Sequence, residues 1–225
     1  MNSIQNLNWS RIEEELHSQG FSVTEPILTT EECINLIENY KDDSLFRSRI
    51  QMEKFRFGAG EYQYFKYPLP HLIETLRHDF YPHLAPVANK WLRSLELDRG
   101  YPEALTEFLE QCHRGGQKRP TPLMLSYNKD DYNCLHQDLY GEIFFPIQGT
   151  CLLSDPKKDF SGGEFLLIEQ RPRAQSAGSV VSIPQGAFVF FATSFRPVKG
   201  ARGYYRVTMR HGVSKIRSGT RFTLG

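Results

Sequence analysis

The sequence of 225 residues has no apolar run near the ~20 residues that a membrane-spanning helix needs. Its first sixteen residues, MNSIQNLNWSRIEEEL, contain neither the basic nor the apolar part of a secretory signal. Cysteine is scarce and never occurs in a CxxC pair, so nothing indicates a disulfide framework or a zinc ribbon. The four cysteines are Cys33, Cys112, Cys134 and Cys151. We therefore expect a cytoplasmic protein with no membrane partner.

Acidic residues are absent from the last 56 positions. That segment carries a net charge of +10, whereas the first 169 residues carry −9 and the whole chain +1. Its basic residues are Arg171, Arg173, Arg196, Lys199, Arg202, Arg206, Arg210, Lys215, Arg217 and Arg221. Such an asymmetry predicts a face for an anionic ligand or substrate. The alternative is an ordinary solvated surface of chance composition.

The composition, with 40% hydrophobic and 24% charged residues, is typical of a globular protein. At about 150 residues per domain the length fits one large domain or two small ones. Helical periodicity dominates residues 1–119, and short apolar or alternating runs separated by Gly, Pro, Asp and Ser dominate residues 120–225. We expect one α+β domain over residues 1–225, with a helical layer that precedes an antiparallel barrel or sandwich.

Two capping-box spacings predict helix starts in the N-terminal half. Ser10 with Glu13 precedes one periodic segment, and Thr29 with Glu32 precedes another. A third helix is expected over residues 71–97, split or kinked by its two internal prolines, Pro82 and Pro86. A fourth helix is expected over residues 102–116, and a short strand over residues 21–28.

An aromatic, glycine-punctuated stretch joins the second and third of these helices. Alternation predicts two short strands, one over Phe55 and Phe57 and the other over Tyr62 and Tyr64. With Phe65 and Tyr67, these rings form a candidate lid in which the basic side chains of Lys54, Arg56 and Lys66 are interleaved. Such a lid would stack on a flipped base and touch phosphates. The alternative is a plain hydrophobic hairpin that covers the barrel.

His136, Gln137 and Asp138 form the most informative tripeptide. In an extended segment residues i and i+2 point to the same side, so the imidazole and the carboxylate can bind one ion. The one histidine downstream is His211, in a predicted late strand. Two histidines and one carboxylate with open positions match the facial triad of non-haem Fe(II) oxygenases. The alternative is that His136 caps a loop and His211 is a packed core residue.

Arg221 favours the metal site. It lies ten residues after His211, across a hairpin turn predicted at Ser218 and Gly219. A cosubstrate that chelates iron through a keto-acid end needs its far carboxylate held, and a guanidinium does this with two parallel bonds. Thr223, two residues further along the same strand, is expected to face the same way and to donate its hydroxyl to that carboxylate.

The set of His136, Asp138, His211 and Arg221 resembles the signature of the Fe(II)/2-oxoglutarate-dependent dioxygenases. The run FSGGEFLLIE is similar to the GGE strand of their prolyl-hydroxylase-like branch. SYNKDDYNCLHQD resembles the AlkB-type branch, in which a tyrosine precedes the first ligand by nine residues, here Tyr127. The segment from LHQD to the C-terminal GTRFTLG also resembles a bacterial oxygenase family associated with oxidative demethylation of nucleic acids. One departure is Leu125, where AlkB-type members have asparagine.

This resemblance implies a double-stranded β-helix (jelly-roll) core over residues 120–225, with residues 1–119 as helical support and lid. It implies Fe(II) held by His136, Asp138 and His211, and 2-oxoglutarate held by Arg221 and Tyr127. The implied reaction is decarboxylation of 2-oxoglutarate by O₂, coupled to hydroxylation or oxidative demethylation of a substrate. Alkylated nucleic acid is the leading substrate candidate.

Two other hypotheses remain at this stage. The first is hydroxylation of a protein side chain or a small metabolite, and the second is a non-catalytic β-barrel binding module. Cys134 shares the predicted face of His136, where we expect a small packed residue rather than a thiol at the metal. Four other histidines have no carboxylate at metal-ligand spacing and are expected at the surface or at caps. They are His71, His78, His83 and His113.

Overall fold

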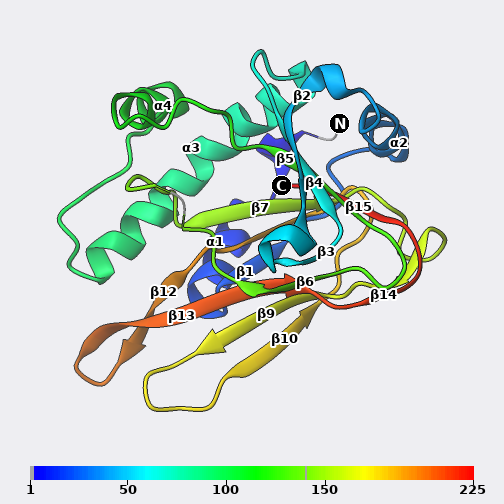
Figure 1. The fold of residues 1–225 in the computed structure, drawn as a ribbon. Coiled ribbons are helices and arrows are strands. Elements are labelled where there is room, and N and C mark those ends of the chain that lie inside the picture. Colours follow the sequence, from blue (N-terminus) through cyan, green and yellow to red (C-terminus); the bar gives the residue numbers. More distant parts are fainter. Residues whose placement is uncertain (1–2, 140) are drawn as a thin grey trace.

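Figure 1 shows a computed structural model that describes residues 3–139 and 141–225. In it, α3 and α4 lie above β7 on one side of the molecule, and β9, β10 and β13 lie on the opposite side. The helical elements, with 3₁₀ turns labelled η, are η1 (Ile4–Asn6), α1 (Trp9–Ser18), α2 (Thr30–Asn39), η2 (Asp43–Leu45), η3 (Met52–Phe55), α3 (His71–Ser94) and α4 (Leu105–Arg114). None of the helices in these described ranges is long and apolar enough to span a bilayer.

The strands are short, and every pairing among the described residues is antiparallel. They are β1 (Phe21–Val23), β2 (Phe46–Gln51), β3 (Gly58–Ala59), β4 (Glu61–Phe65), β5 (Leu123–Tyr127), β6 (Tyr132–His136), β7 (Ile147–Leu152), β8 (Phe160–Gly162), β9 (Phe165–Gln170), β10 (Ala177–Val181), β11 (Phe188–Ala192), β12 (Phe195–Gly200), β13 (Gly203–Val213), β14 (Ile216–Gly219) and β15 (Arg221–Leu224). The expected mixture of helices and antiparallel strands is therefore present.

The strands form two large sheets and one small one. The first sheet has the order β1-β11-β7-β15-β5-β4-β2, and the second has the order β10-β9-β13-β6-β3 with β12 paired to β13. The small sheet pairs β14 with β8. From β5 to β15 the chain crosses repeatedly between the two large sheets, and in the second sheet β6 lies beside β13.

The core lies in two layers, one on each face of the first sheet. β11, with the sequence FVFFA, is buried along its whole length because its side chains alternate between these layers. Phe188 and Phe190 pack with Phe80 and Trp91 of α3. Phe191 packs instead against Phe165 of the second sheet and other residues between the sheets. The layer between the sheets surrounds the candidate site.

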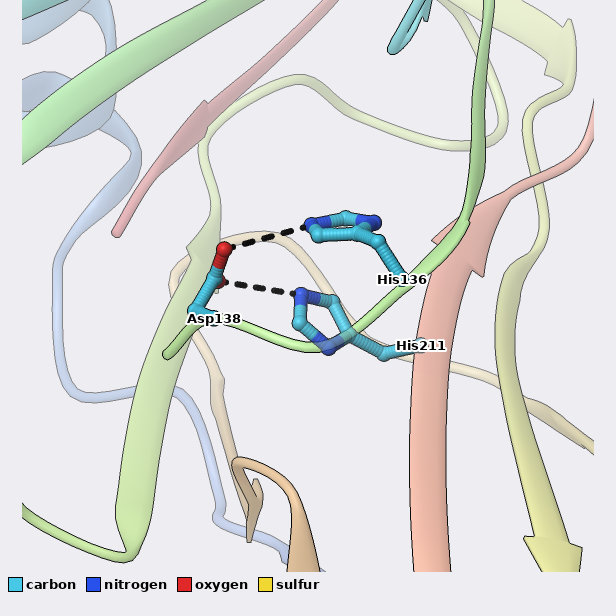
Figure 2. A group of neighbouring side chains, drawn as sticks. All are labelled: His136, Asp138 and His211. Carbon is cyan, nitrogen blue, oxygen red and sulfur yellow. Dashed lines mark ion pairs between the residues drawn. The ribbon is translucent and has the colours of Figure 1, made fainter. Parts of the chain in front are cut away.

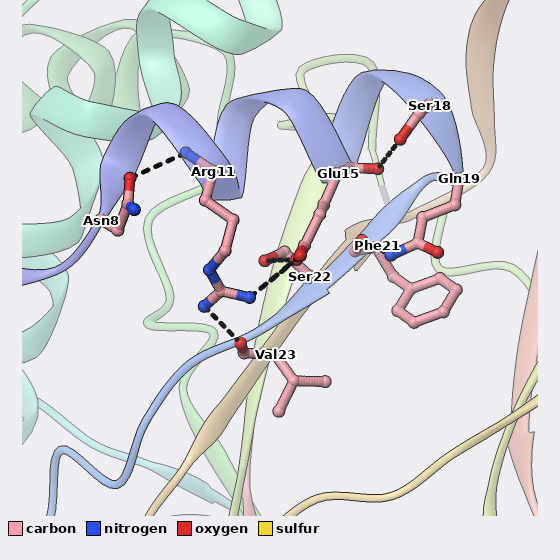
Figure 3. A network of polar contacts seen from close by, with 8 residues as sticks. All are labelled: Asn8, Arg11, Glu15, Ser18, Gln19, Phe21, Ser22 and Val23. Carbon is pink, nitrogen blue, oxygen red and sulfur yellow. Dashed lines mark hydrogen bonds and ion pairs between the residues drawn. The ribbon is translucent and has the colours of Figure 1, made fainter.

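Helix α1 begins one residue before the predicted cap. The side chain of Asn8, not Ser10, caps it by accepting a hydrogen bond from the backbone N–H of Arg11 (3.0 Å; Figure 3). Arg11 then donates to Glu15 (3.0 Å) and to the carbonyl of Val23 on β1 (3.0 Å), and Ser22 donates to Glu15 (2.6 Å). These bonds fasten α1 to the edge of the first sheet.

Helix α2 begins as predicted. The hydroxyl of Thr29 accepts from the backbone N–H of Glu32 (3.2 Å), while the carboxylate of Glu32 accepts from the backbone N–H of Thr29 (2.9 Å). The capping box expected from the sequence is confirmed.

The third helix was expected to be split or kinked at its two prolines, and of these the split is wrong. α3 runs unbroken for 24 residues with Pro82 and Pro86 inside it. Each internal proline costs roughly 3 kcal/mol of helix stability. Ten side chains of α3 are buried, including Phe80, Leu84 and Trp91, and each large apolar one contributes roughly 1.5–3 kcal/mol. Burial along the whole length therefore outweighs the two interruptions.

The aromatic stretch departs from the predicted strand pair. Tyr62 and Tyr64 lie in β4 as expected, but Phe55 lies in the 3₁₀ turn η3 and Phe57 in a bend before β3. Phe65 is 1% exposed and belongs to the core beneath the helices, so it forms no part of a lid.

Candidate metal centre

The two histidines face each other across neighbouring strands. β6 ends at His136, whose Cα pairs with that of His211 on β13, and the centres of their rings are 4.2 Å apart. Asp138 lies two residues beyond the end of β6 and points back toward both rings (Figure 2). Its carboxylate oxygens are 3.5 Å from Nε2 of His136 and 3.4 Å from Nε2 of His211. The structure thus brings the three residues together.

Neighbouring groups orient these side chains. Because a carbonyl can only accept, Nδ1 of His136 is the protonated ring nitrogen and donates to the backbone of Cys134 (2.7 Å). This leaves the Nε2 lone pair of His136 directed at the centre. The amide of Gln148 on β7 donates to Oδ2 of Asp138 (2.8 Å). Nδ1 of His211 is buried without a hydrogen-bond partner among the described residues.

The chemistry of this donor set fits a divalent transition metal. The three ligand atoms lie within 4.8 Å of one another. Burial acts to raise the pKa of Asp138, but the hydrogen bond and charge of His211, helped by His136 and Gln148, outweigh it and lower that pKa to about 2. Burial also lowers the pKa of His211. Metal binding requires an ionised carboxylate and imidazole nitrogens with free lone pairs, and the lowered pKa values of Asp138 and His211 both favour these forms.

Arg221 is buried beside this centre with no anionic partner. It is 2% exposed, and its guanidinium lies 5.7 Å from the ring centre of Tyr127 and 5.9 Å from that of Phe160. Within the described residues no carboxylate forms an ion pair with it. Burial lowers its pKa from 12.5 to about 10, although Tyr127 acts in the opposite direction. A buried, uncompensated guanidinium is a binding group for an anion.

The route of the chain to Arg221 differs from the predicted hairpin. Ser218 and Gly219 lie in β14, which pairs with β8. The next strand, β15, belongs to the first sheet, whereas His211 lies in the second. Gly163 has φ +64° and lies against the arginine stem, because a Cβ there would be 3.0 Å from Cδ of Arg221. This close approach accounts for the second glycine of the GGE run.

Tyr127 and Thr223 lie near Arg221 in the first sheet. Tyr127 is the Cα partner of Arg221, and its hydroxyl accepts from the amide of Asn133 (3.2 Å). Burial raises the pKa of Tyr127 to about 12, against the opposing charge of Arg221, so its phenol stays protonated. Thr223 is 1% exposed on the same strand as Arg221.

One cavity of about 680 Å³ connects these groups. The triad, Arg221, Tyr127 and Thr223 all line it. So do four side chains of the aromatic stretch and its surroundings, namely Arg56, Phe57, Tyr62 and Tyr64. Volumes of 300–1,000 Å³ are typical of sites that enclose small molecules.

The sequence did not indicate every group at this site. Gln148, which fixes Asp138, and Asn133, which binds Tyr127, were missed; the signal that Gln148 offered is a polar amide in a strand that begins and ends with apolar residues. The expectation that Cys134 is packed is wrong, because its side chain is exposed.

Comparison with known proteins supports an oxygenase. The model of the Oxygenase-NA family, described as "Oxygenase, catalysing oxidative methylation of damaged DNA", matches residues 60–225. Two proteins of Mycobacterium tuberculosis, both called uncharacterized, are 49% identical over 161 residues, which is 72% of this chain and 69% of theirs.

Solved structures share the fold at low identity. A prolyl-4-hydroxylase from Pseudomonas putida is 12% identical with a TM-score of 0.57, covering 96% of this chain and 95% of that one. A 2OG-Fe(II) oxygenase family oxidoreductase from Burkholderia pseudomallei is also 12% identical, with a TM-score of 0.53 and coverage of 96% and 88%.

Proposed function

The chain belongs to the Oxygenase-NA family, and from this premise we propose that it is an Fe(II)- and 2-oxoglutarate-dependent dioxygenase that oxidatively demethylates alkylated nucleic acid. The observation that carries the proposal is the convergence of His136, Asp138 and His211 beside the buried, unpaired guanidinium of Arg221. The oxygenase predicted from the sequence is confirmed at the level of the family.

We assign the metal to Nε2 of both histidines and to the carboxylate of Asp138. When bound, Fe(II) and 2-oxoglutarate supply the activation of O₂ and the oxidation of substrate, with 2-oxoglutarate decarboxylated to succinate. The chain's own part is to hold the ligands in place. Cys134 fixes the tautomer of His136 through its carbonyl, and Gln148 holds one oxygen of Asp138 (2.8 Å).

We assign 2-oxoglutarate to the part of the cavity lined by Arg221. Its far carboxylate would neutralise the guanidinium and accept two parallel charge-assisted hydrogen bonds. Thr223 would donate its hydroxyl to the same carboxylate, and the protonated phenol of Tyr127 would donate to the same molecule. The support is that all three side chains line one cavity with the triad.

Nucleic acid is the proposed substrate because of the family description and the surroundings of the cavity. Phe55 and Phe57 are 54% and 40% exposed and stack on each other, with ring centres 5.6 Å apart and Arg56 between them in sequence. Exposed aromatic rings beside a cation are suited to stacking on bases. The product of oxidising a base methyl group is an unstable hydroxymethyl that releases formaldehyde.

We further propose that eight strands form a jelly roll in a single domain over residues 1–225. β11, β7, β15 and β5 lie in that order in the first sheet, and β10, β9, β13 and β6 in the second. The chain alternates between the two sets, as in a double Greek key. Strands β1, β2 and β4 extend the first sheet, which joins the N-terminal half to this core. A cytoplasmic location remains a proposal, consistent with four free cysteines.

The test is product analysis with methylated single-stranded oligonucleotides, in the presence of Fe(II), 2-oxoglutarate and O₂. We expect formaldehyde and, above the substrate-free background, an equal amount of succinate, and neither product from the His211→Ala variant. His78→Ala, which removes a surface histidine paired with Glu74 on α3, is the matched control and should retain both products. Succinate formed with peptides or metabolites but never with oligonucleotides would refute the substrate. The absence of any succinate would refute the oxygenase itself.

A further inference from the structure

The ionisable side chains around the cavity are strongly biased toward positive charge. Outside the two histidines of the metal centre, the cationic or basic side chains among its described lining residues are Arg56, Arg77, His113, Arg119 and Arg221. Asp138 is the one carboxylate side chain among those described lining residues. 2-Oxoglutarate accounts for Arg221, so the remaining cations call for a second anionic group.

One guanidinium nitrogen of Arg77 lies buried in the cavity wall. Arg77 is on α3, and its Nη1 has no hydrogen-bond partner among the described residues. The carboxylate on the preceding helical turn, Glu74, instead contacts His78 (3.1 Å). Within the described residues Arg77 forms no ion pair with any carboxylate. A guanidinium N–H buried in this way remains unsatisfied until a ligand reaches it.

Arg119 adds a second cation at the start of the segment that leads into β5. Its neighbour Arg47 donates to the carbonyl of Pro120 (3.2 Å) and covers the ring of Tyr64 (4.3 Å). Burial lowers the pKa of Arg47, and the nearby charge of Arg119 lowers it further. Within the described residues, neither arginine forms an ion pair with a carboxylate. Arg47 and the exposed Arg119 thus place two like charges near each other, and no described carboxylate pairs with either.

We propose that Arg77 and Arg119 form a second anion site, separate from that of Arg221, which binds a backbone phosphate of a single-stranded nucleic acid. The inference rests on the proposed function and specifies how its substrate is held. Because Nη1 of Arg77 is buried in the cavity wall, the phosphate must enter the cavity. A continuous duplex does not present its backbone in this way, whereas a single strand or an extruded nucleotide does.

The test is equilibrium binding of a fluorescein-labelled, single-stranded 12-mer to the full chain, with Fe(II) and 2-oxoglutarate under anaerobic conditions. Each lost phosphate contact should reduce the slope of log K against log salt concentration by about 0.7. We expect Arg77→Gln and Arg119→Gln each to weaken binding about tenfold, the loss expected for one charge-assisted hydrogen bond, and each to reduce the slope by that amount. Arg77→Lys should keep most of the slope because the charge remains.

Arg202→Gln is the matched control. Arg202 is exposed in the loop between β12 and β13, so this substitution removes one positive charge at a position away from the cavity. Its affinity and slope should equal those of the wild type. If Arg77→Gln binds with unchanged affinity and slope, or if the slopes fall equally in Arg202→Gln, the site is refuted.

Consumption of 2-oxoglutarate without substrate separates this proposal from the proposed function. It should be equal in wild type, Arg77→Gln and Arg119→Gln, which also shows that these variants are folded. Oligonucleotide binding that responds to Arg77 in a protein that never consumes 2-oxoglutarate would support the phosphate site and refute the oxygenase. Consumption of 2-oxoglutarate by a protein that binds no oligonucleotide would support the oxygenase and refute the phosphate site.

Discussion

Replacing Arg221 by methionine should stabilise the protein that lacks its ligands and at the same time weaken its binding of 2-oxoglutarate about 100-fold. The pKa of Arg221 falls from 12.5 to about 10, chiefly through burial. At about 1.4 kcal/mol for each pH unit, holding this charge costs the folded state about 3 kcal/mol. The pKa of Arg221 lies above 7 in both the unfolded and the folded state, so the side chain is charged in both and the whole cost is present at neutral pH.

Methionine fills a similar volume without a charge, but it loses the contacts of the guanidinium with the rings of Tyr127 and Phe160. These contribute roughly 0.5–1 kcal/mol each, which leaves a net gain of about 1–2 kcal/mol. For a chain of this length the midpoint of thermal unfolding should rise by about 5 °C. Two charged hydrogen bonds to 2-oxoglutarate are lost, so its affinity should fall about 100-fold.

The assay is thermal unfolding of wild type and variant, with and without 2-oxoglutarate. Arg196→Met is the matched control, because Arg196 is also 2% exposed but donates to Glu169 (3.0 Å). Its replacement leaves Glu169 with Arg171 as its remaining cationic partner (2.7 Å), so it should lower the free energy of unfolding by about 2 kcal/mol. If Arg221→Met is destabilised like Arg196→Met, or is stabilised by 2-oxoglutarate at the same concentrations as the wild type, the reasoning about an unpaired binding cation is refuted.

Further predictions concern the support of the metal and the helix caps. Gln148→Leu removes the amide that holds Asp138, so metal affinity measured by titration should fall about 10–100-fold. An unchanged affinity would show that this hydrogen bond does not contribute to metal binding. Asn8→Ala should lower the free energy of unfolding by about 1 kcal/mol in urea denaturation, whereas Ser10→Ala should change it by less than about 0.5 kcal/mol. Thr29→Ala should cost about 1 kcal/mol in the same experiment, and a neutral effect would contradict the observed capping box.

Local sequence signals predicted most of the helices and strands. The errors occurred where tertiary burial, or a second competent residue nearby, determined where a helix begins or whether it continues. The box of Thr29 and Glu32 forms as expected. At α1 both Asn8 and Ser10 are competent caps, and the sequence alone gave no reason to prefer the earlier one. Pro82 weakens a helix in isolation, but the buried face of α3 keeps it continuous.

The metal centre was accessible to sequence reasoning because few residues could form it. His136 and Asp138 lie two residues apart, and His211 is the one histidine that follows them. The partners of these residues were not accessible in the same way. Gln148 reaches Asp138 from another strand, and the path from His211 to Arg221 runs through a separate small sheet rather than a hairpin. Such pairings depend on how strands are ordered in space, which no local pattern contains.

Anaerobic titration with Fe(II) and then 2-oxoglutarate, followed by visible absorption, tests the central claim most directly. Two imidazoles, one carboxylate and a guanidinium that together hold iron and a keto acid predict a weak charge-transfer band in the wild type. The band should require both additions and should be absent in His211→Ala. A band of equal strength in His211→Ala, or none in the folded wild type, would contradict the account.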